Sequence, residues 1–525
     1  MNTTHQQSTI FARSPLWQLQ RQYFQETNIN AWRTGDVPHY ITSNPHMAST
    51  YAQLLLAFFR DLHHKRKTQE TVYIIELGAG SGRFSYCLLK SLTHLLENTS
   101  FNAPPFVYVM TDFVEETLNF WDGHLRFQEF FEKGWLDFAL FDAEKDRKLH
   151  LRKSNQMLEY KSVKTPLVVI ANYFFDSIPQ DLFYIDNEKV NTISVNLEGY
   201  NPKAEVSAKS QLEDIDLKYT YTPVKQVAFD NPRLQYIFDS YQKKLSNSHL
   251  LFPTIGIDCL ERLTMMSQEG ALVLTADKAA CDLEYWNNSS APYVAKHGSF
   301  SLTANYHALK EHCLISEGKP LFPNHPSSSI SVAVLLYLPE PTTYKETLLC
   351  YQNQVSNFGP DEYFSIKKHI EQQIYILSIR DLFAYIRLSN YDSRLFHQFL
   401  PRLQALAEEL NQDQRFALLE LIVKVWEGYF PLAEDVDLAY EIGLLLLELY
   451  FYYDAIGFFI LSERIYGPKE EVLFAQAGTY AVIGKQKNAL DLLNIILEKN
   501  PENTIAGELY EMLQNNEKSY PGLAN

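Results

Sequence analysis

Three alternating glycines follow a short apolar run and precede a helical pattern. Gly78, Gly80 and Gly82 come directly after the run VYIIEL, and apolar residues then recur at helical spacing from Phe84 onward. A glycine turn between a strand and a helix lets the backbone approach a ligand closely. The arrangement therefore predicts a site for a nucleotide-like ligand, with Glu76 as the acidic residue at the end of the strand.

The spacing of these glycines separates two kinds of nucleotide site. A dinucleotide-binding loop needs a small residue where this chain has Arg83, because that residue lets helix and strand pack closely. The sequence therefore disfavours an oxidoreductase that uses a dinucleotide. The string of Glu76 and the three glycines resembles the first motif of class I methyltransferases, and this implies S-adenosyl-L-methionine as the cofactor. A purely structural turn is the alternative for the loop taken alone.

The next two predicted strands also end in acidic residues. The run VYVMTD ends in Asp112, which we expect to accept both ribose hydroxyls of adenosine. The run DFALFD ends in Asp142, which we expect to accept the adenine amino group. Carboxylates suit this cofactor because it carries no phosphate. Helix capping is the alternative for Asp112, and a plain surface loop is the alternative for Asp142.

Polar residues follow the fourth predicted strand, PLVVIAN. In an open α/β sheet the carboxyl ends of the strands hold the ligand, so Asn172, Tyr173 and Asp176 are the predicted catalytic residues. We expect Asn172 to hold a nucleophile through its carbonyl group and Asp176 to accept a proton or bind a cation. Tyr173 would help to align the acceptor. Capping of the following helix is the alternative for Asn172 and Asp176.

The order of motifs resembles that of the MidA family of methyltransferases. The motifs are ITSNP at 41–45, ELGAGSG at 76–82, the NxxxDxxP string at 172–179, ALVLTAD at 271–277 and SLTANYHAL at 301–309. The family is associated with the assembly of mitochondrial complex I and is proposed to dimethylate a protein arginine. The resemblance covers about residues 35–338 and implies the same fold and cofactor for them.

Two positions depart from the pattern of this family. Tyr173 stands where the family usually has glutamate, and His46 stands where its opening motif tends to have an acid. A second carboxylate favours a guanidinium, because paired oxygens bind it in a bidentate way. The departures therefore indicate a divergent acceptor or lost catalysis.

Hydrophobic patterning predicts an α/β chain in three parts. Residues 1–70 form a helical preface, and residues 71–338 form a methyltransferase domain with a Rossmann-like, mostly parallel sheet. Residues 180–245 alternate as strands would, which predicts a strand-rich insertion on the substrate side. Residues 345–525 read as consecutive amphipathic helices and predict an all-α domain.

A period of 34 residues relates two segments of the helical region. Gly443 and Ala455 recur as Ala477 and Ala489, and Pro501 follows the second copy. The period resembles that of the tetratricopeptide repeat over about residues 436–503, which implies binding of a partner protein. Two helical hairpins that share this period by coincidence are the alternative.

Composition narrows the range of functions. The formal net charge of -17 repels phosphates, so we expect no nucleic-acid substrate. The five cysteines show no CxxC or CxxH spacing, so we expect no disulfide framework and no metal site. The sequence contains neither a secretion signal nor a run of about 18 apolar residues, which predicts a cytoplasmic protein without a membrane span. The oligomeric state stays open.

Two hypotheses of different classes follow from the sequence. The leading one is an S-adenosyl-L-methionine-dependent methyltransferase that acts on a side chain of a partner protein. The alternative is a methyltransferase-fold scaffold, with or without bound cofactor, whose helical repeats mediate protein–protein interaction.

Overall fold

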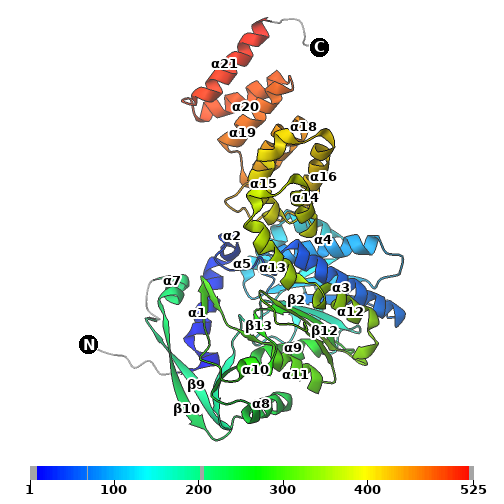
Figure 1. The fold of residues 1–525 in the computed structure, drawn as a ribbon, viewed down its shortest axis with the longest axis vertical. Coiled ribbons are helices and arrows are strands. Elements are labelled where there is room, and N and C mark those ends of the chain that lie inside the picture. Colours follow the sequence, from blue (N-terminus) through cyan, green and yellow to red (C-terminus); the bar gives the residue numbers. More distant parts are fainter. Residues whose placement is uncertain (1–8, 68, 202–205, 520–525) are drawn as a thin grey trace, which may run out of the picture. The chain divides into compact units, whose positions relative to one another are not determined.

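The computed structural model describes residues 9–67, 69–201 and 206–519 of the 525-residue chain. The chain divides into two compact units, Met1–Lys368 and His369–Asn525 (Figure 1). The first unit is mixed α/β and the second is helical. Within the described residues, no helix combines the length and apolar character that crossing a membrane requires.

A seven-stranded sheet forms the centre of the first unit. Its strands lie in the order β17-β18-β12-β7-β2-β3-β4. Their bounds are β2 (Val72–Glu76), β3 (Phe106–Asp112), β4 (Leu136–Leu140), β7 (Leu167–Asn172), β12 (Ala271–Asp277), β17 (Lys319–Leu321) and β18 (Ser331–Tyr337). Strands β2, β3, β4, β7 and β12 pair in parallel, whereas β18 is antiparallel to both of its neighbours.

The strand order reverses between β2 and β7. From β2 the chain adds β3 and β4 on one side, and it then returns to place β7 on the other side of β2. Such a reversal leaves a crevice at the carboxyl ends of the strands, and ligands of open α/β sheets bind there. The topology therefore directs attention to the residues after β2, β3, β4 and β7.

All six apolar runs that hydrophobic patterning predicts as buried strands form strands of this sheet. The runs are VYIIEL, VYVMTD, DFALFD, PLVVIAN, ALVLTAD and SISVAVLLYL. Every residue of β12 and of β18 is buried, as expected for strands covered on both faces. Leu260 of α9 and Leu309 of α11 share one hydrophobic cluster with Val169 and Val273. On the other face, Phe59 of α3 packs against Phe106, with the two ring centroids 6.1 Å apart.

Helices of the first unit surround the sheet. Those that carry the argument are α1 (Pro15–Thr27), α2 (Asn30–Arg33), α3 (Pro45–His64), α4 (Arg83–Glu97), α9 (Thr254–Thr264) and α11 (Tyr306–Ile315). The others are α5 (Glu115–Gly123), α6 (Leu125–Glu132), α7 (Ala208–Asp214), α8 (Pro232–Lys244) and α10 (Leu283–Trp286). Helix α3 begins at Pro45, the last residue of the ITSNP motif, and Asn44 caps it, because Asn44 Oδ1 accepts from the Met47 N–H at 3.0 Å.

The predicted insertion contributes to a second, antiparallel sheet. Its strands β8 (Asp181–Asp186), β9 (Lys189–Glu198) and β10 (Asp216–Val224) pair in sequence as a meander. β11 (Ser248–Phe252) pairs with β8, and β1 (Thr9–Ile10) pairs with β9. The sheet thus recruits strands from beyond both ends of residues 180–245.

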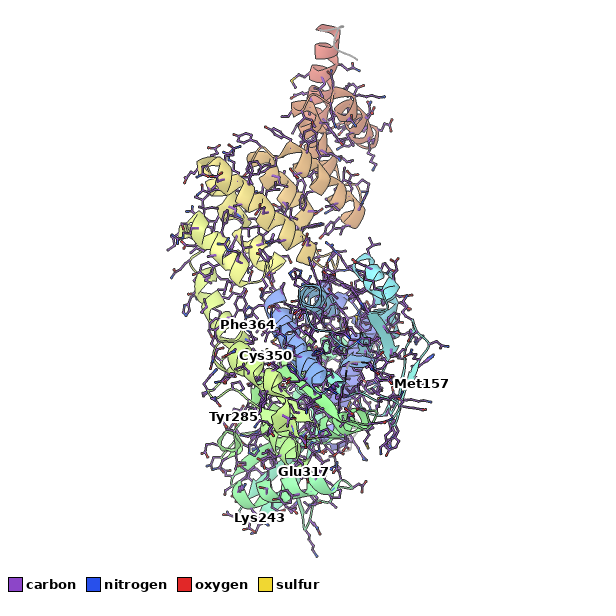
Figure 2. The ribbon with its side chains drawn as sticks, turned by 90° about the vertical axis from the view of Figure 1, so that its right-hand side faces the viewer. Met157, Lys243, Tyr285, Glu317, Cys350 and Phe364 are labelled. Atoms are coloured by element: carbon purple, nitrogen blue, oxygen red, sulfur yellow. The ribbon has the colours of Figure 1, made fainter. Side chains whose placement is uncertain are left out.

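The first unit extends past the residue at which the sequence prediction starts the helical domain. The N-terminus of helix α12 (Lys345–Tyr351) packs on Asp61 of α3. The Asp61 carboxylate accepts from the backbone N–H groups of Glu346 and Thr347 at 3.1 and 2.9 Å. Phe364 of α13 (Pro360–Glu371), labelled in Figure 2, contacts Tyr40 at a ring distance of 6.1 Å. These contacts explain why residues 345–368 pack with the sheet.

The second unit consists of consecutive helices. They are α14 (Ile379–Leu388), α15 (Ser393–Leu406), α16 (Gln412–Gly428), α17 (Leu438–Glu448), α18 (Tyr452–Tyr466), α19 (Glu470–Val482), α20 (Gln486–Lys499) and α21 (Thr504–Ser519). Helices α17 and α18 form one contacting pair, and α19 and α20 form the next. The small residues Ala455, Ala477 and Ala489 of the 34-residue period are fully buried.

Gly443 offers a test of the packing between α17 and α18. A Cβ atom at this position would overlap the ring of Phe459, which lies on α18. We expect Gly443→Ala to lower the free energy of unfolding by about 1–3 kcal/mol, because overpacking forces the helices apart. Differential scanning calorimetry measures the change.

Gly457 on α18 is the matched control. Nothing lies within 4 Å of its Cβ position, so Gly457→Ala should stabilise by roughly 0.5–1 kcal/mol through helix propensity. Equal changes of the same sign in both variants would contradict this account of the packing.

Candidate functional site

A cavity lies at the carboxyl ends of the strands and contains most of the predicted site residues. Its lining includes Glu76, Gly78, Gly80, Asp112 and Asp142 of the predicted cofactor set. It also includes the three predicted catalytic residues, Asn172, Tyr173 and Asp176. Helices α1 and α2 add side chains to the same cavity.

The three glycines play different parts in the loop. All have positive φ, +62° at Gly78, +54° at Gly80 and +77° at Gly82, a region that costs other residues energy. A Cβ at Gly78 would meet no atom within 4 Å, whereas one at Gly80 would lie 2.7 Å from the ring of Trp32. Gly82 does not line the cavity; it precedes α4, and its Cβ would lie 2.9 Å from Met110. Gly82 is therefore needed for packing.

Glu76 is buried below the glycine loop. Its Oε2 accepts from the hydroxyls of Ser85 and Tyr108, the latter at 2.7 Å. Burial raises the pKa of Glu76, and so does the charge of Asp112, whereas the two hydroxyls lower it. The resulting pKa is about 7. The two hydroxyls fix the side chain at the mouth of the loop.

Asp112 ends β3 on the cavity wall and is also buried. Its Oδ1 accepts from the Val114 N–H at 3.1 Å. Burial raises the pKa of Asp112 to about 6, although backbone N–H groups and the charge of Arg21 lower it. The group is therefore mostly ionised at neutral pH and can accept hydrogen bonds from hydroxyls.

Asp142 has a partner that the sequence analysis did not anticipate. Arg21 of α1 donates to both of its oxygens, at 3.3 Å to Oδ1 and 2.7 Å to Oδ2, and the guanidinium lies 4.5 Å from the ring of Phe113. Burial tends to raise the pKa of Asp142, but Arg21 outweighs it and the pKa is lowered. A carboxylate engaged in this way is poorly available to an adenine amino group, so Asp142 anchors α1 at the cavity.

Asn172 is oriented by a residue of α3. The Tyr51 hydroxyl donates to Asn172 Oδ1 at 2.8 Å, while Asn172 Nδ2 is buried and has no hydrogen-bond partner. The carbonyl that the sequence prediction assigns to a nucleophile thus already accepts one hydrogen bond, and it keeps a second lone pair. The group of the side chain without a partner is its N–H donor.

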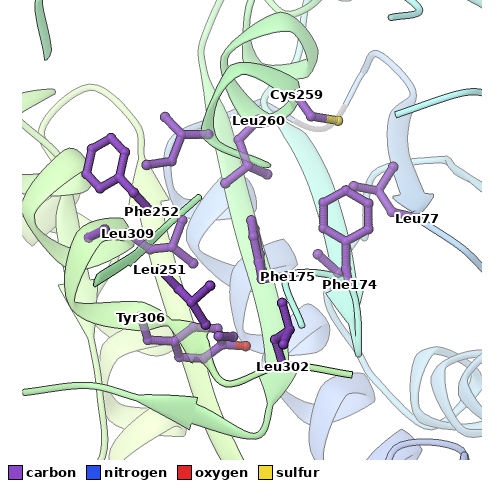
Figure 3. Packing of buried hydrophobic residues seen from close by; sticks show 14 of the residues in the cluster. Leu77, Phe174, Phe175, Leu251, Phe252, Cys259, Leu260, Leu302, Tyr306 and Leu309 are labelled. Atoms are coloured by element: carbon purple, nitrogen blue, oxygen red, sulfur yellow. The ribbon is translucent and has the colours of Figure 1, made fainter. Parts of the chain in front are cut away.

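Tyr173 and the loop after β7 are held by the hydrophobic core. Tyr173 has φ of +47°, which is uncommon for a side chain of this size and marks a conformation imposed by its surroundings. The next two residues, Phe174 and Phe175, are buried, and their rings meet at 5.1 Å (Figure 3). They anchor the loop so that Tyr173 and Asp176 stand on the cavity wall.

Asp176 and Asp277 form a buried carboxyl pair. Asp277 ends β12, is fully buried, and accepts from the Phe175 N–H at 3.1 Å. Asp176 Oδ1 accepts from the Ser177 hydroxyl at 2.6 Å. Burial raises the pKa of Asp176 to about 6, and burial together with the charge of Asp176 raises that of Asp277 well above its usual value. The two carboxyls therefore resist being ionised together, because burial and the charge of one disfavour the charge of the other.

The pair predicts a pH-dependent gain of stability in Asp277→Asn. The ordinary pKa of aspartate is 3.8, and that of Asp277 is raised in the folded state. Below pH 3.8 the residue therefore does not lower the free energy of unfolding, and this stability is lost as the pH rises through the folded-state pKa. We expect the variant to gain on the order of 1–3 kcal/mol at pH 8 and much less at pH 4, measured by thermal unfolding.

Asp186 supplies the control for this prediction. It is exposed, and its pKa is lowered, first by the hydrogen bond from Ser246. Asp186→Asn should therefore give no gain at pH 8. An equal gain of Asp277→Asn at both pH values would contradict the buried pair.

Other residues of the cavity come from distant parts of the chain. Lys278, His297 and Ser301 line it, and the charge of Lys278 lowers the pKa of Asp176. The Leu302 N–H donates to the carbonyl of Asp176 at 3.0 Å, so the LTAN motif supports the loop after β7. Burial lowers the pKa of His297, and the charge of Lys278 lowers it further.

Sequence reasoning missed Arg21, Tyr51, Asp277 and Lys278. Asp277 carried a usable signal, because it ends a predicted strand as Asp112 does. Arg21 and Tyr51 lie in helical patterns that predict no site. His46, by contrast, does not line the cavity; its ring stacks on Tyr363 at 4.1 Å.

Part of the first unit matches a known protein family. Residues 51–288 match the model of a family described as "Putative S-adenosyl-L-methionine-dependent methyltransferase". The match supports a relation of this chain to methyltransferases that use S-adenosyl-L-methionine. S-adenosyl-L-methionine, the cofactor predicted from the glycine loop, is thereby confirmed. No curated protein matches the chain.

Two solved structures from Burkholderia thailandensis are distantly similar. One, described as an uncharacterized superfamily protein, is 13% identical with a TM-score of 0.37, over 60% of this chain and 73% of that one. The other, described as a "superfamily member and likely methyl transferase", contains S-adenosyl-homocysteine; it is 14% identical with a TM-score of 0.37, over 60% of this chain and 74% of that one. Likenesses this distant carry no argument for the present chain.

Proposed function

We propose that this chain is a class I, MidA-like methyltransferase that transfers the methyl group of S-adenosyl-L-methionine to a side chain of a partner protein. The observation that carries the proposal is the convergence of the glycine loop, Glu76, Asp112 and Asn172 on one cavity. The mostly parallel sheet, with its reversal of strand order between β2 and β7, supports a Rossmann-like fold.

The residues of the cavity fit this cofactor. The missing side chain of Gly78 leaves open space beside the loop, and the carboxylates of Glu76 and Asp112 suit a nucleoside without phosphates. When bound, the cofactor supplies an electrophilic methyl group on a sulfonium sulfur. Glu76, Gly78, Gly80 and Asp112 would hold it.

The residues after β7 would orient the methyl acceptor. Asn172 and Tyr173 fix its position, and Asp176 takes its proton. Proximity and orientation supply most of the acceleration in such a displacement. Phe174 and Phe175 anchor this loop in the core and so hold the acceptor in position. This matters because small shifts of the reacting atoms lower the reaction rate strongly.

The second unit supports the choice of a protein as substrate. Its helical hairpins α17–α18 and α19–α20 carry the 34-residue period, and we assign them to a tetratricopeptide-like array that binds a partner. The net charge of -17 argues against nucleic acid. We place the reaction in the cytoplasm.

Isothermal titration calorimetry with S-adenosylhomocysteine tests the proposal. We expect one site per chain with micromolar affinity, and transfer of labelled methyl groups to proteins of a cell extract. Absence of heat at millimolar ligand would overturn it. A chain that binds the ligand but labels nothing would instead be the scaffold of the alternative hypothesis, with its helical hairpins as the functional part.

A further inference from the structure

One face of helix α1 forms part of the cavity wall. Trp17, Gln20, Arg21 and Phe24 all line the cavity. Their spacing is i, i+3, i+4 and i+7, which places four side chains on the same face of a helix. Leu19, on another side of α1, is buried in the main hydrophobic cluster. The helix is therefore held by the core while this face meets whatever ligand occupies the cavity.

Arg21 and Phe24 join α1 to two loops at the carboxyl edge of the sheet. Arg21 donates to Asp142 at 2.7 Å and to Glu144 at 2.8 Å, both in the loop after β4. Its guanidinium lies 4.5 Å from the ring of Phe113, which follows β3, and the ring of Phe24 lies 6.4 Å from that same ring. The side chain of Arg21 is 32% exposed, so salt can screen its ion pairs.

Trp32 of α2 packs on the glycine loop without filling the space beside it. A Cβ atom at Gly80 would lie 2.7 Å from the Trp32 ring, so the indole rests directly on the backbone of this glycine. A Cβ atom at Gly78 would meet no atom within 4 Å. Trp32, Arg21 and Gly78 line the same cavity. The two helices thus border an open space beside the loop, as a cover over a ligand does, and they do not occupy it as a plug would.

We propose, on the basis of the function proposed above, that α1 and α2 form a cover over the bound cofactor. Arg21 and Trp32 are its positioning residues, because they join the helices to the loops after β4 and β2. These side chains and the glycine loop would enclose S-adenosyl-L-methionine, and release of the product would require the ion pairs of Arg21 to break. Both helices precede residue 51, where the match to the methyltransferase family begins.

Hydrogen–deuterium exchange on the full chain tests whether the ligand lies beneath the two helices. Mass spectrometry follows exchange in peptides from residues 15–33, with and without saturating S-adenosylhomocysteine. A ligand under the cover adds contacts to it, so we expect these backbone amides to exchange at least about threefold more slowly in the complex. Faster exchange would show that the ligand displaces the helices, and unchanged exchange would show a purely structural role. Either result would overturn the proposal.

Arg21→Met tests how the cover is fastened. The substitution keeps the length of the side chain but removes its charge. We expect S-adenosylhomocysteine to dissociate about tenfold faster in surface plasmon resonance, roughly the effect of one charge-assisted hydrogen bond. Because salt screens partly exposed ion pairs, higher ionic strength should speed dissociation from the wild-type protein more than from Arg21→Met. A merely structural role of Arg21 would not produce this difference in salt dependence.

Lys67→Met is the matched control. Lys67 forms an ion pair with Glu269 and is 36% exposed, but neither residue lines the cavity. This variant should release S-adenosylhomocysteine at the wild-type rate at low and high salt. Trp32→Ala is a second test variant, because it removes the indole from Gly80 and should also speed dissociation severalfold. Thermal unfolding of each variant verifies that the chain is folded under the conditions of measurement.

The outcomes separate the cover from the proposed function. Failure of the wild-type protein to bind S-adenosylhomocysteine would overturn both. Binding with unchanged dissociation in Arg21→Met and Trp32→Ala would overturn the cover alone. Tighter binding in either variant would also overturn it, because a segment that blocks the site yields more easily once its anchor is removed.

Discussion

Replacing Gly78 by arginine should weaken binding of S-adenosylhomocysteine by about 100-fold or more while the chain stays folded. Gly78 has φ of +62° and faces open space in the cavity. A side chain there costs roughly 1–2 kcal/mol in backbone strain and also fills the space beside the loop that the cofactor needs. Calorimetry gives the dissociation constant, and thermal unfolding reports on the fold.

Gly134 allows the two effects of this substitution to be separated. It has φ of +68°, and nothing lies within 4 Å of its Cβ position, but it does not line the cavity. Gly134→Arg should therefore show a similar loss of stability with unchanged affinity. If both variants bind S-adenosylhomocysteine like the wild-type protein, the glycine loop is not the cofactor site.

Replacing Asp176 by asparagine should lower the rate of methyl transfer by about 100- to 1,000-fold, because the acceptor loses its general base. Binding of S-adenosylhomocysteine should change little, since the residue acts on the acceptor. The measurement is transfer of labelled methyl groups to cell-extract proteins, with calorimetry on the same preparation.

The pH profile distinguishes a base from a structural residue. Burial raises the pKa of Asp176 to about 6, and a base must be ionised, so wild-type activity should fall as the pH drops through about 6. The Asp176→Asn variant should lack this decrease. Ser177→Ala removes the hydroxyl that stabilises the ionised form, so the decrease should move to higher pH. An unchanged acid limb in Asp176→Asn would show that another group titrates.

The carboxyl groups of Asp176 and Asp277 connect the stability of the fold with the proposed catalysis. The buried pair costs folding energy at neutral pH, as the expected gain of Asp277→Asn expresses. The same burial raises the pKa of Asp176 to about 6, close to neutral pH, where the proposed general base would be most effective. Substitutions in the Asp176–Asp277 pair are therefore expected to change the free energy of unfolding and the rate of methyl transfer in opposite directions.

Much of the sheet and of the cofactor loop was predictable from the sequence. Buried parallel strands produce continuous apolar runs, and all six runs form strands of the main sheet. The glycine spacing is local information, because glycine adopts the positive φ of these positions more readily than other residues. Placement of Glu76 and Asp112 followed from the rule that the strand ends meet at one edge of the sheet.

The boundary of the helical region and the roles of single side chains were less predictable. Helices α12 and α13 have the same amphipathic pattern as the helices that follow them. Only tertiary contacts assign them to the first unit: Asp61 accepts from the N-terminus of α12, and Tyr40 contacts Phe364 of α13. Asp142 has the position expected for a cofactor contact, yet its partner Arg21 decides what it does.

By itself, the sequence determined the cofactor and predicted the edge of the sheet at which we propose that it binds, because strand periodicity and glycine conformation are local properties of the chain. Only the tertiary structure decided what the site presents to the acceptor. Tyr51 lies 121 residues from Asn172, and Arg21 lies 121 residues from Asp142. Hydrogen bonds across such separations leave no periodic pattern, yet they fix whether an amide offers its oxygen or its nitrogen and whether a carboxylate is free to bind a ligand.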